Sequence, residues 1–453
     1  MKKFTAVLAV LALTLVASVA MAEVTVSGSV DIRSLKLNNT SDYSDKAATS
    51  DRQNTTQERI RVNIDGKHDN VKGRITFEND WEVWGTEQNI TNGNLLNPPS
   101  TGTETMGVEA RQGQPVNGGK TFGIREAWID FTIPGAQPAH VKVGHQFLQL
   151  GNGWFFRSMK YGSDAWLVGL PGKNTIAFVD VKVGEGLTTQ SDDIDAYVLL
   201  DNFKIDDTKT VGAYFARVND RRGGFLGGTE ANLDNIGLWF NGKLGPVNLQ
   251  AEVDFQMGKA KGAGNTGGDV KFKGTQIVFQ GNMAAGPAKI NATIAQGSGN
   301  DLASTADEVK AYVPVLDSDP HYTVVYEYFA KTACAIGDDG TNVLYAKNTG
   351  FCNTTALNIG GSMDVAKWLN VSLDFWMLKA VEKVSIGNTA LTNTNLSDKI
   401  GNEIDLVLRF KLYDQLTWNW QIARLMPGKA YDKAGGVAAD DMDAIQGILS
   451  YKF

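Results

Sequence analysis

Apolar and polar side chains alternate along much of this chain with a period of two, which places successive residues of a β-strand on opposite faces. The clearest case is 247–257, where every odd-numbered residue is apolar and every even-numbered residue is polar or charged. The stretch 400–412 repeats the pattern, with Ile404 on the face opposite to Glu403 and Asp405. Stretches of about ten residues with one apolar and one polar face predict strands that cross a lipid bilayer at a tilt.

The connections between such stretches indicate how the strands are arranged. The chain yields 18 strands when a short one at 165–171 is included. Short turns, such as 68–70 and 413–415, then fall at one end together with both termini, and the generally longer gaps fall at the other end. We interpret 298–353 as one long extracellular loop, although 321–329 would also fit a strand. The expected fold is all-β: a transmembrane antiparallel up-and-down β-barrel of 18 strands, with 16 strands as the alternative.

The stretch 443–453 is amphipathic and ends on an aromatic residue. It resembles the terminal strand of bacterial outer-membrane barrels. That resemblance implies that Tyr451 and Phe453 form an assembly signal, read by the barrel assembly machinery of the outer membrane. An edge strand of a soluble β-sandwich is the alternative. In a barrel this stretch would pair with the first strand, near 24–32, and remove the unpaired edges that a bilayer does not tolerate.

The N-terminus predicts export. Lys2 and Lys3 precede a run, 4–19, that is apolar apart from small hydroxyl residues, and Ala-Met-Ala then stands before Glu23. This order is typical of a secretory signal peptide, here 1–22. A retained membrane anchor is the alternative, but the run is short for a spanning helix.

Composition favours one domain rather than several. A soluble chain of 453 residues usually divides into domains, yet no linker rich in Pro or Ser interrupts this one. The hydrophobic fraction is only 42% and 49 residues are Gly. A barrel filled with water or polar side chains needs apolar residues only at alternate positions. We therefore expect a single β-barrel domain, 23–453, in the bacterial outer membrane.

Sequence motifs give no sign of catalysis. The chain has four histidines and lacks a Gly-x-Ser-x-Gly elbow, a metal-ligand pair or a phosphate-binding loop. We expect no catalytic residue, metal site, cofactor or nucleic-acid partner. An outer-membrane hydrolase with a Ser-His pair on its outer wall is the alternative.

The polar faces of the strands supply the candidate functional groups. Basic residues cluster on the second and third strands, and acidic residues predominate near 252–254 and 374. Opposed charges of this kind would set up a field across a water-filled pore. Alternatively, these charges pair with one another and only stabilise the wall. The predicted pore-lining residues are Arg59, Arg61, Lys72, Arg74, Glu78, Glu126, Asp130, Lys142, Glu252, Asp254, Asp374, Glu403, Asp405, Arg409 and Lys411.

The segment 149–164 after the fifth strand is unusually aromatic for a loop in water. Folded into the lumen, it would narrow the channel and offer charge and stacking surface to sugars or other ring-bearing solutes. Packing outside the barrel against neighbouring loops is the alternative. The predicted constriction residues are Trp154, Phe155, Phe156, Arg157, Lys160, Tyr161 and Asp164.

Two cysteines, Cys334 and Cys352, occur in this exported chain. An even pair in an oxidising compartment favours a disulfide. The cross-link would stabilise the protein by about 3 kcal/mol on the chain-entropy model. Two free thiols or a metal site are the alternatives.

The whole mature chain resembles a Gram-negative outer-membrane porin. The stretch 141–153, Val-Lys-Val-Gly-His-Gln-Phe-Leu-Gln-Leu-Gly-Asn-Gly, is similar to a strand-and-loop segment of the alginate-export group of 18-stranded barrels, and 369–378 is similar to one of its late strands. The alginate pore of that group is lined by many arginines, whereas the inward set here is mixed and the chain has a net charge of −7.

This resemblance implies a porin-type channel for passive diffusion of small hydrophilic solutes and ions, in contact with outer-membrane lipid. It also implies a homotrimer, and the net acidic chain suggests a preference for cations. A barrel sheath around an electron-carrying partner, a structural or adhesive barrel without open conductance, and a soluble exported binding protein are the alternatives.

Overall fold

The structure is a computed structural model. It describes residues 23–45, 52–84, 122–159, 162–186, 192–222, 229–262, 268–301, 307–314, 322–336, 344–345, 349–387 and 396–453. The predicted signal peptide, the gap 85–120 and His321 lie outside the described residues, as do Lys160 and Tyr161 of the predicted constriction set.

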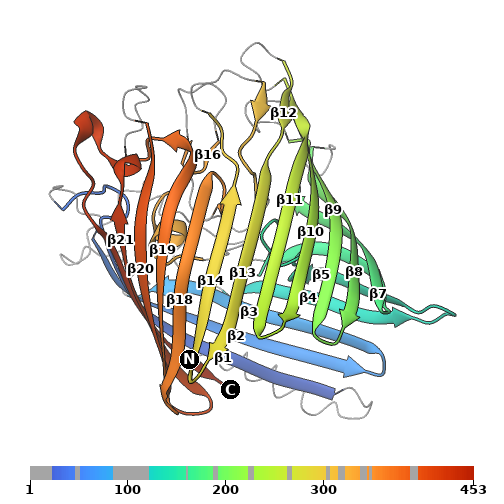
Figure 1. Cartoon of the computed structure of the whole chain (residues 1–453). Helices are drawn as coiled ribbons and strands as arrows, with labels where there is room; N and C mark the ends of the chain where they lie inside the picture. The colour runs from blue at the N-terminus through green and yellow to red at the C-terminus, as the bar shows by residue number, and fades with distance from the viewer. Residues whose placement is uncertain are drawn as a thin grey trace, which may run out of the picture.

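Eighteen long strands form one closed sheet (Figure 1). In chain order they are β1 (Glu23–Asn38), β2 (Gln53–His68), β3 (Val71–Val83), β4 (Gly123–Ile133), β5 (Ala139–Gln146), β6 (Ser163–Leu170), β7 (Asn174–Gly184), β8 (Ile194–Asp206), β9 (Lys209–Asp220), β10 (Glu230–Leu244), β11 (Val247–Lys261), β13 (Thr275–Ala285), β14 (Ala288–Gly297), β18 (Thr354–Ala366), β19 (Leu369–Val384), β20 (Ser397–Lys411), β21 (Leu416–Pro427) and β22 (Met442–Lys452).

The strand count confirms 18 and shows that the 16-strand alternative is wrong. The short strand expected at 165–171 is present as β6. The short strands β12 (Val270–Phe272) and β15 (Glu308–Val309) extend the wall beyond β11. A separate two-stranded sheet pairs β16 (Ala335–Ile336) with β17 (Leu344–Tyr345).

Closure occurs between the first and last strands. β1 pairs antiparallel with β22 from Ser29–Lys452 to Asn38–Asp443. Beyond β22, the backbone N–H of Gly28 donates to the carbonyl of Phe453 at 2.9 Å, and the N–H of Phe453 donates to the carbonyl of Gly28 at 3.1 Å. From Gly28 to Asn38, β1 is therefore paired on both sides, which closes the barrel and removes the free edges there.

The tight turns and the C-terminus lie at one end of the barrel (Figure 1). All the predicted short connections, from 69–70 between β2 and β3 to 412–415 between β20 and β21, are at this end. We call it the short-turn end. The two faces of each strand also agree with the predicted alternation: on β11, Phe255 is 45% exposed on the outer face, whereas Glu252 and Asp254 are at most 1% exposed.

Aromatic side chains form a chain of contacts near the short-turn end. The rings of Trp368 and Phe410 are 6.0 Å apart, those of Phe410 and Trp418 are 6.0 Å apart, and those of Trp418 and Trp420 are 5.3 Å apart. This arrangement is typical of the aromatic girdle at a membrane interface. Within the described residues, no helix has the length and apolar character needed to span a membrane.

The expectation for 298–353 needs correction. Part of this segment packs inside the barrel, where Val325, Tyr326 and Phe329 are buried, so it is not simply an extracellular loop. The part described from residue 322 onward is not a strand either: Val325–Phe329 is a π-helix, η2. Glu403 on β20 accepts hydrogen bonds from the backbone N–H groups of Val325 and Tyr326. Those contacts satisfy the backbone without a neighbouring strand.

Candidate functional site: a lumen narrowed by two inward segments

The first inward segment, 147–159, follows β5. It closes on itself through a bridge between Gln149 and Arg157 and through the N–H of Leu150, which donates to the carbonyl of Phe156 at 2.9 Å. Phe155 is 1% exposed and stacks on Tyr214 of β9 with ring centroids 6.1 Å apart. The apolar side chains predicted from its composition therefore attach it to the inner face of the wall.

Asn152, at the tip of this segment, connects it to β11. Its backbone N–H donates to Glu252, and its side-chain amide donates to the carbonyl of Ala251 at 2.9 Å. Gly151 precedes it with φ of +53°. A Cβ added there would come within 2.7 Å of Glu252 Oε2. Only glycine fits this close approach without strain.

The second inward segment, 322–334, contains η2. A disulfide of 2.04 Å joins Cys334 to Cys352, just before β18, which confirms the predicted pairing. The hydroxyl of Tyr326 contacts Thr354 Oγ1 at 2.7 Å and accepts the N–H of Ala333 at 2.9 Å. Burial raises the pKa of Tyr326, so this phenol stays neutral. Covalent and hydrogen-bonded contacts thus hold the segment to the start of β18.

The two inward segments are connected through aromatic rings inside the barrel, with Phe351 between them. Trp154 lies 4.8 Å from Phe351, Phe351 lies 4.2 Å from Tyr322, and Tyr322 lies 5.4 Å from Trp376 on β19, measured between ring centroids. A continuous series of rings therefore reaches from the segment after β5 to the wall at β19. It occupies space that would be water in an unobstructed barrel of this size.

Strands β1 to β5 carry the basic part of the lumen, and its charges are largely paired. Arg59 bonds Asp31 at 2.9 Å. Both Arg61 and Arg125 bind Glu78. Cation–π contacts add to these pairs: Trp81 lies against Arg33 at 4.1 Å and Arg59 at 4.2 Å. Further pairs are Arg74 with Asp65 at 2.6 Å, and Lys142 with the ring of Trp128 at 4.1 Å.

The acidic residues lie on β11 and β20 and are mainly used for internal contacts. Asp254 accepts from Tyr214 and, at 2.9 Å, from Asn235. Glu252 and Glu403 bind the inward segments, as described above. Because these carboxylates are buried and already hydrogen-bonded, they contribute less field to the pore than free carboxylates would.

The remaining predicted residues fall into distinct places. Glu126 accepts from Thr76 and Trp128 at 3.2 and 3.0 Å. Asp130 contacts His140 at 2.9 Å. Asp164 lies on β6 rather than in the loop, and it contacts His145 at 2.8 Å.

Two predicted lysines lie at the short-turn end. Lys72 is the second residue of β3. Lys411 bonds Asp414 of the turn at 2.8 Å, so Lys411 stands at the rim. Phe156 is partly buried against the apolar cluster around Phe155.

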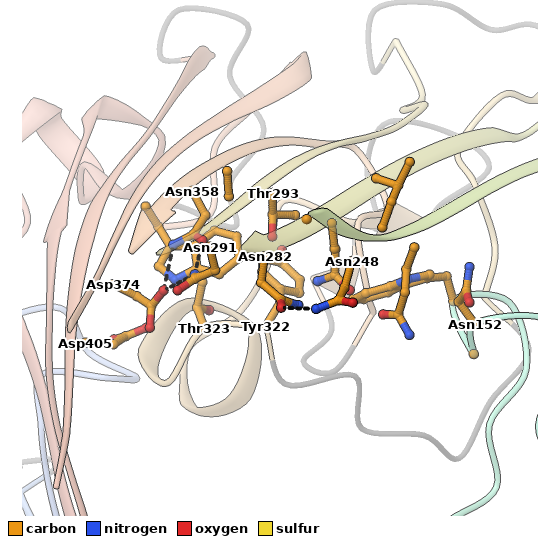
Figure 2. A pocket seen from close by; sticks show the side chains of 18 of the residues that line it. Asn152, Asn248, Asn282, Asn291, Thr293, Tyr322, Thr323, Asn358, Asp374 and Asp405 are labelled. Carbon is orange, nitrogen blue, oxygen red and sulfur yellow. Dashed lines mark hydrogen bonds between the residues drawn. The ribbon is translucent and has the colours of Figure 1, made fainter. Parts of the chain in front are cut away.

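A cavity of 760 Å³ lies between the two inward segments and the wall (Figure 2). Its charged lining residues are Arg157, Asp374, Asp405 and Arg409, all among those predicted. Asparagine and glutamine supply ten of its 25 lining residues, drawn mainly from β10, β11, β13, β14 and β18. Asn248 and Asn282 are close to the turns 245–246 and 286–287, which places the cavity toward the short-turn end.

Comparison with known proteins decides the family. The family model described as "Alginate export" matches residues 44–444. The chain belongs to the alginate export family.

Solved structures agree on the fold of this family member. A BenF-like porin from Pseudomonas fluorescens Pf-5 is 12% identical, with a TM-score of 0.55 over 95% of this chain and 98% of that one. Pseudomonas aeruginosa opdK is 10% identical, with a TM-score of 0.54 over 95% and 98%. P. aeruginosa OccK5 (OpdH) is also 10% identical, with a TM-score of 0.51 over 94% and 98%. No curated protein matches the sequence. The alginate export family member is a bacterial outer-membrane β-barrel with the fold of these porins.

Two groups of lumen residues in this alginate export protein were not predicted from the sequence. Asp31 and Arg33 share the face opposite to Val30 and Ile32, so their alternation was a usable signal. The amides, such as Asn248 and Gln250, also alternate with apolar residues. They were not among the predicted pore-lining residues because only charged side chains were included. Arg125 belongs to neither group: it enters the lumen beside a register shift between β3 and β4 that alternation does not reveal. Among the described residues, no cluster of His, Cys, Asp and Glu could hold a metal ion.

Proposed function

We propose that this protein is a water-filled channel through which small hydrophilic solutes and ions diffuse passively across the outer membrane. The observation that carries the proposal is the polar cavity inside a closed barrel, bounded by two segments held by hydrogen bonds, ring contacts and a disulfide. Its 760 Å³ lies within the size range, about 300–1,000 Å³, of sites for small molecules.

The charges that line the cavity argue against a polyanionic solute. The name of the family refers to alginate export, and a polyanion needs an excess of positive charge along its path. The lining has two arginines and two aspartates, so its formal charges cancel. The sequence as a whole has a net charge of −7, which favours cations weakly over anions.

Planar-bilayer recordings of the purified, refolded protein test this function. We expect ohmic openings in KCl and, in a salt gradient, a reversal potential that indicates modest cation preference. Clear anion selectivity would contradict the cation preference alone. A barrel that never conducts would support the sheath or structural alternatives and overturn the channel.

Assembly and oligomeric state belong to the same proposal. We propose that Tyr451 and Phe453 are read by the barrel assembly machinery, and that the barrel associates as a homotrimer in outer-membrane lipid. The Phe453 backbone completes the β1–β22 junction. We also propose that transport proceeds without catalytic turnover or a cofactor.

A further inference from the structure

The wall on one side of the cavity is built from rows of neutral amides. Neighbouring strands place their inward residues directly opposite one another, and side chains on one face are then close enough to act together. One row runs without interruption through the register pairs Asn241–Gln250, Gln250–Gln280 and Gln280–Thr293. It extends over β10, β11, β13 and β14, and all four of its side chains line the cavity.

A second row lies one step nearer the short turns. Asn248 pairs in register with Asn282, and Asn282 pairs with Asn291. Asn248 Nδ2 donates to Asn282 Oδ1 at 3.0 Å, and Asn291 Nδ2 donates to Asp374 Oδ1 at 2.7 Å (Figure 2). Each amide offers two donors and a carbonyl with two lone pairs, so these bonds leave further donors and acceptors for a ligand.

Two buried polar atoms in the same lining lack a partner. Trp376 Nε1 and the single atom Asp405 Oδ1 make no hydrogen bond with any described residue, although the Asp405 carboxyl also bonds Glu403 and the backbone of Val324. The two residues are 5% and 4% exposed, and both line the cavity. Leaving a buried donor or acceptor unsatisfied is unfavourable. One donor and one acceptor, side by side with the amide rows, fit a ligand that can both accept and donate hydrogen bonds.

Aromatic rings border the same space. Trp154 and Tyr322 come from the two inward segments, and Trp376 comes from β19. Flat rings next to hydrogen-bonding groups suit a ligand with an apolar ring face and a polar edge. The four charged lining residues, two arginines and two aspartates, present no large excess of charge of either sign to a ligand.

We propose that this cavity is a binding site for a neutral saccharide, which the channel recognises as it passes. The proposal rests on the channel function proposed above and names its solute class. Hydroxyl groups are at once donors and acceptors and so match the amide rows, whereas a carboxylated sugar would face Asp374 and Asp405 without an excess of cations. An apolar solute would leave the amides unsatisfied.

Block of the KCl current by maltotriose tests the proposal. We expect a block that saturates with concentration in the millimolar range, because a transported solute must bind weakly enough to leave. Polyethylene glycol of the same hydrodynamic size is the comparison, since it fills volume but has few donors. Equal block by both would show simple exclusion of volume and overturn the saccharide site.

Two variants locate the site. Trp376→Phe keeps a ring and removes the indole N–H, and Trp420→Phe makes the same change on the outer face of β21, beside Trp418. We expect Trp376→Phe to weaken the maltotriose block about five- to tenfold, as for the loss of roughly 1 kcal/mol or slightly more. Trp420→Phe should leave the block unchanged. Similar blocking constants for maltotriose in the two variants would contradict the placing of the site at Trp376.

A second pair of variants tests the amides. The double change Asn248→Ala and Asn282→Ala removes two neighbouring amides of the second row. The control, Asn63→Ala on β2, removes a lumen amide that donates to Ser27 at 3.3 Å and does not line the cavity. We expect the maltotriose block to be at least tenfold weaker in the double variant. The block in the control should be the same as in the unaltered protein. An unchanged block in the double variant would overturn the role of the amide rows.

The outcomes separate this proposal from the channel itself. Conductance in KCl without a specific maltotriose block would overturn the saccharide site and leave the channel intact. Absence of conductance would overturn the channel, and saturation-transfer NMR of maltotriose with the same detergent-solubilised protein would then decide binding alone. A transfer signal lost in Trp376→Phe would support the site, and no signal in the unaltered protein would overturn it.

Discussion

Two glutamates of the wall, Glu252 and Glu403, hold the inward segments by the same physical means. Each is buried and accepts backbone N–H groups, from Asn152 in the first case and from Val325 and Tyr326 in the second. An intramolecular hydrogen bond contributes about 0.5–1.5 kcal/mol to stability. At the scale of single residues, these carboxyl groups are better understood as anchors than as free charges facing a solute.

Gly151 gives a prediction at this scale. Gly151→Ala should destabilise the inward segment by more than Gly245→Ala destabilises its turn. Both positions have a left-handed backbone, with φ of +53° and +60°, so both substitutions carry a backbone cost of about 1–2 kcal/mol. Only the first would also bring a Cβ within 2.7 Å of Glu252, since nothing lies within 4 Å of a Cβ at Gly245.

Thermal unfolding and channel noise of the two variants measure the difference. We expect Gly151→Ala alone to increase current fluctuations, because the segment would detach more often. Equal thermal stability and equal current fluctuations in the two variants would contradict the prediction. They would mean that the close approach of Gly151 to Glu252 does not restrict the side chain at position 151.

At the scale of elements, the inward segments are tied to the barrel at different points. The segment 147–159 depends on packing against β9 and contacts with β11, whereas 322–334 has a covalent tie through Cys334 and Cys352. Charge pairs on β1 to β5 fix neighbouring strands to one another, as Glu78 does for Arg61 and Arg125. The cavity exists because these elements stop short of filling the short-turn end.

Removal of the disulfide is the prediction for the second segment. The double variant Cys334→Ser and Cys352→Ser should lower the free energy of unfolding by about 3 kcal/mol, for a disulfide with a sequence separation of 18. In the folded barrel it also removes the covalent link between the second inward segment and the start of β18. We expect more frequent transitions between conductance levels in bilayer recordings. A reducing agent should have the same effect on the unaltered protein and none on the double variant. Unchanged recordings in both experiments would show that the noncovalent contacts suffice.

At the scale of the whole molecule, closure makes the barrel compatible with a membrane. The ladder between β1 and β22 extends to Phe453, whose backbone exchanges two hydrogen bonds with Gly28. The ring of Phe453 lies against Gly28, where an added Cβ would be 2.6 Å from it. The end of the chain therefore belongs to the seam that joins the barrel.

Deletion of Phe453 should impair assembly in the outer membrane more than it alters conductance. The deleted chain loses the last hydrogen bonds of the seam and the proposed signal, while every residue that lines the cavity remains. The amount of folded barrel in outer-membrane fractions, and the single-channel conductance of the barrels that do form, measure these two effects. Phe453→Tyr, which keeps an aromatic end, is the control. Normal assembly of the deleted chain would contradict the prediction.

The sequence by itself determined the number of strands, the face that each presents, the short-turn end and the cysteine pair. These features depend on local alternation, such as that in 247–257, and on a bilayer that requires apolar residues on every outer face. Tertiary structure alone decided that 147–159 and 322–334 pack inside, that Glu78 serves two arginines, and that amides from neighbouring strands form rows. These features depend on register and on contacts between residues such as Asn152 and Glu252, which are 100 positions apart. Nothing local encodes which side chains will meet across the lumen.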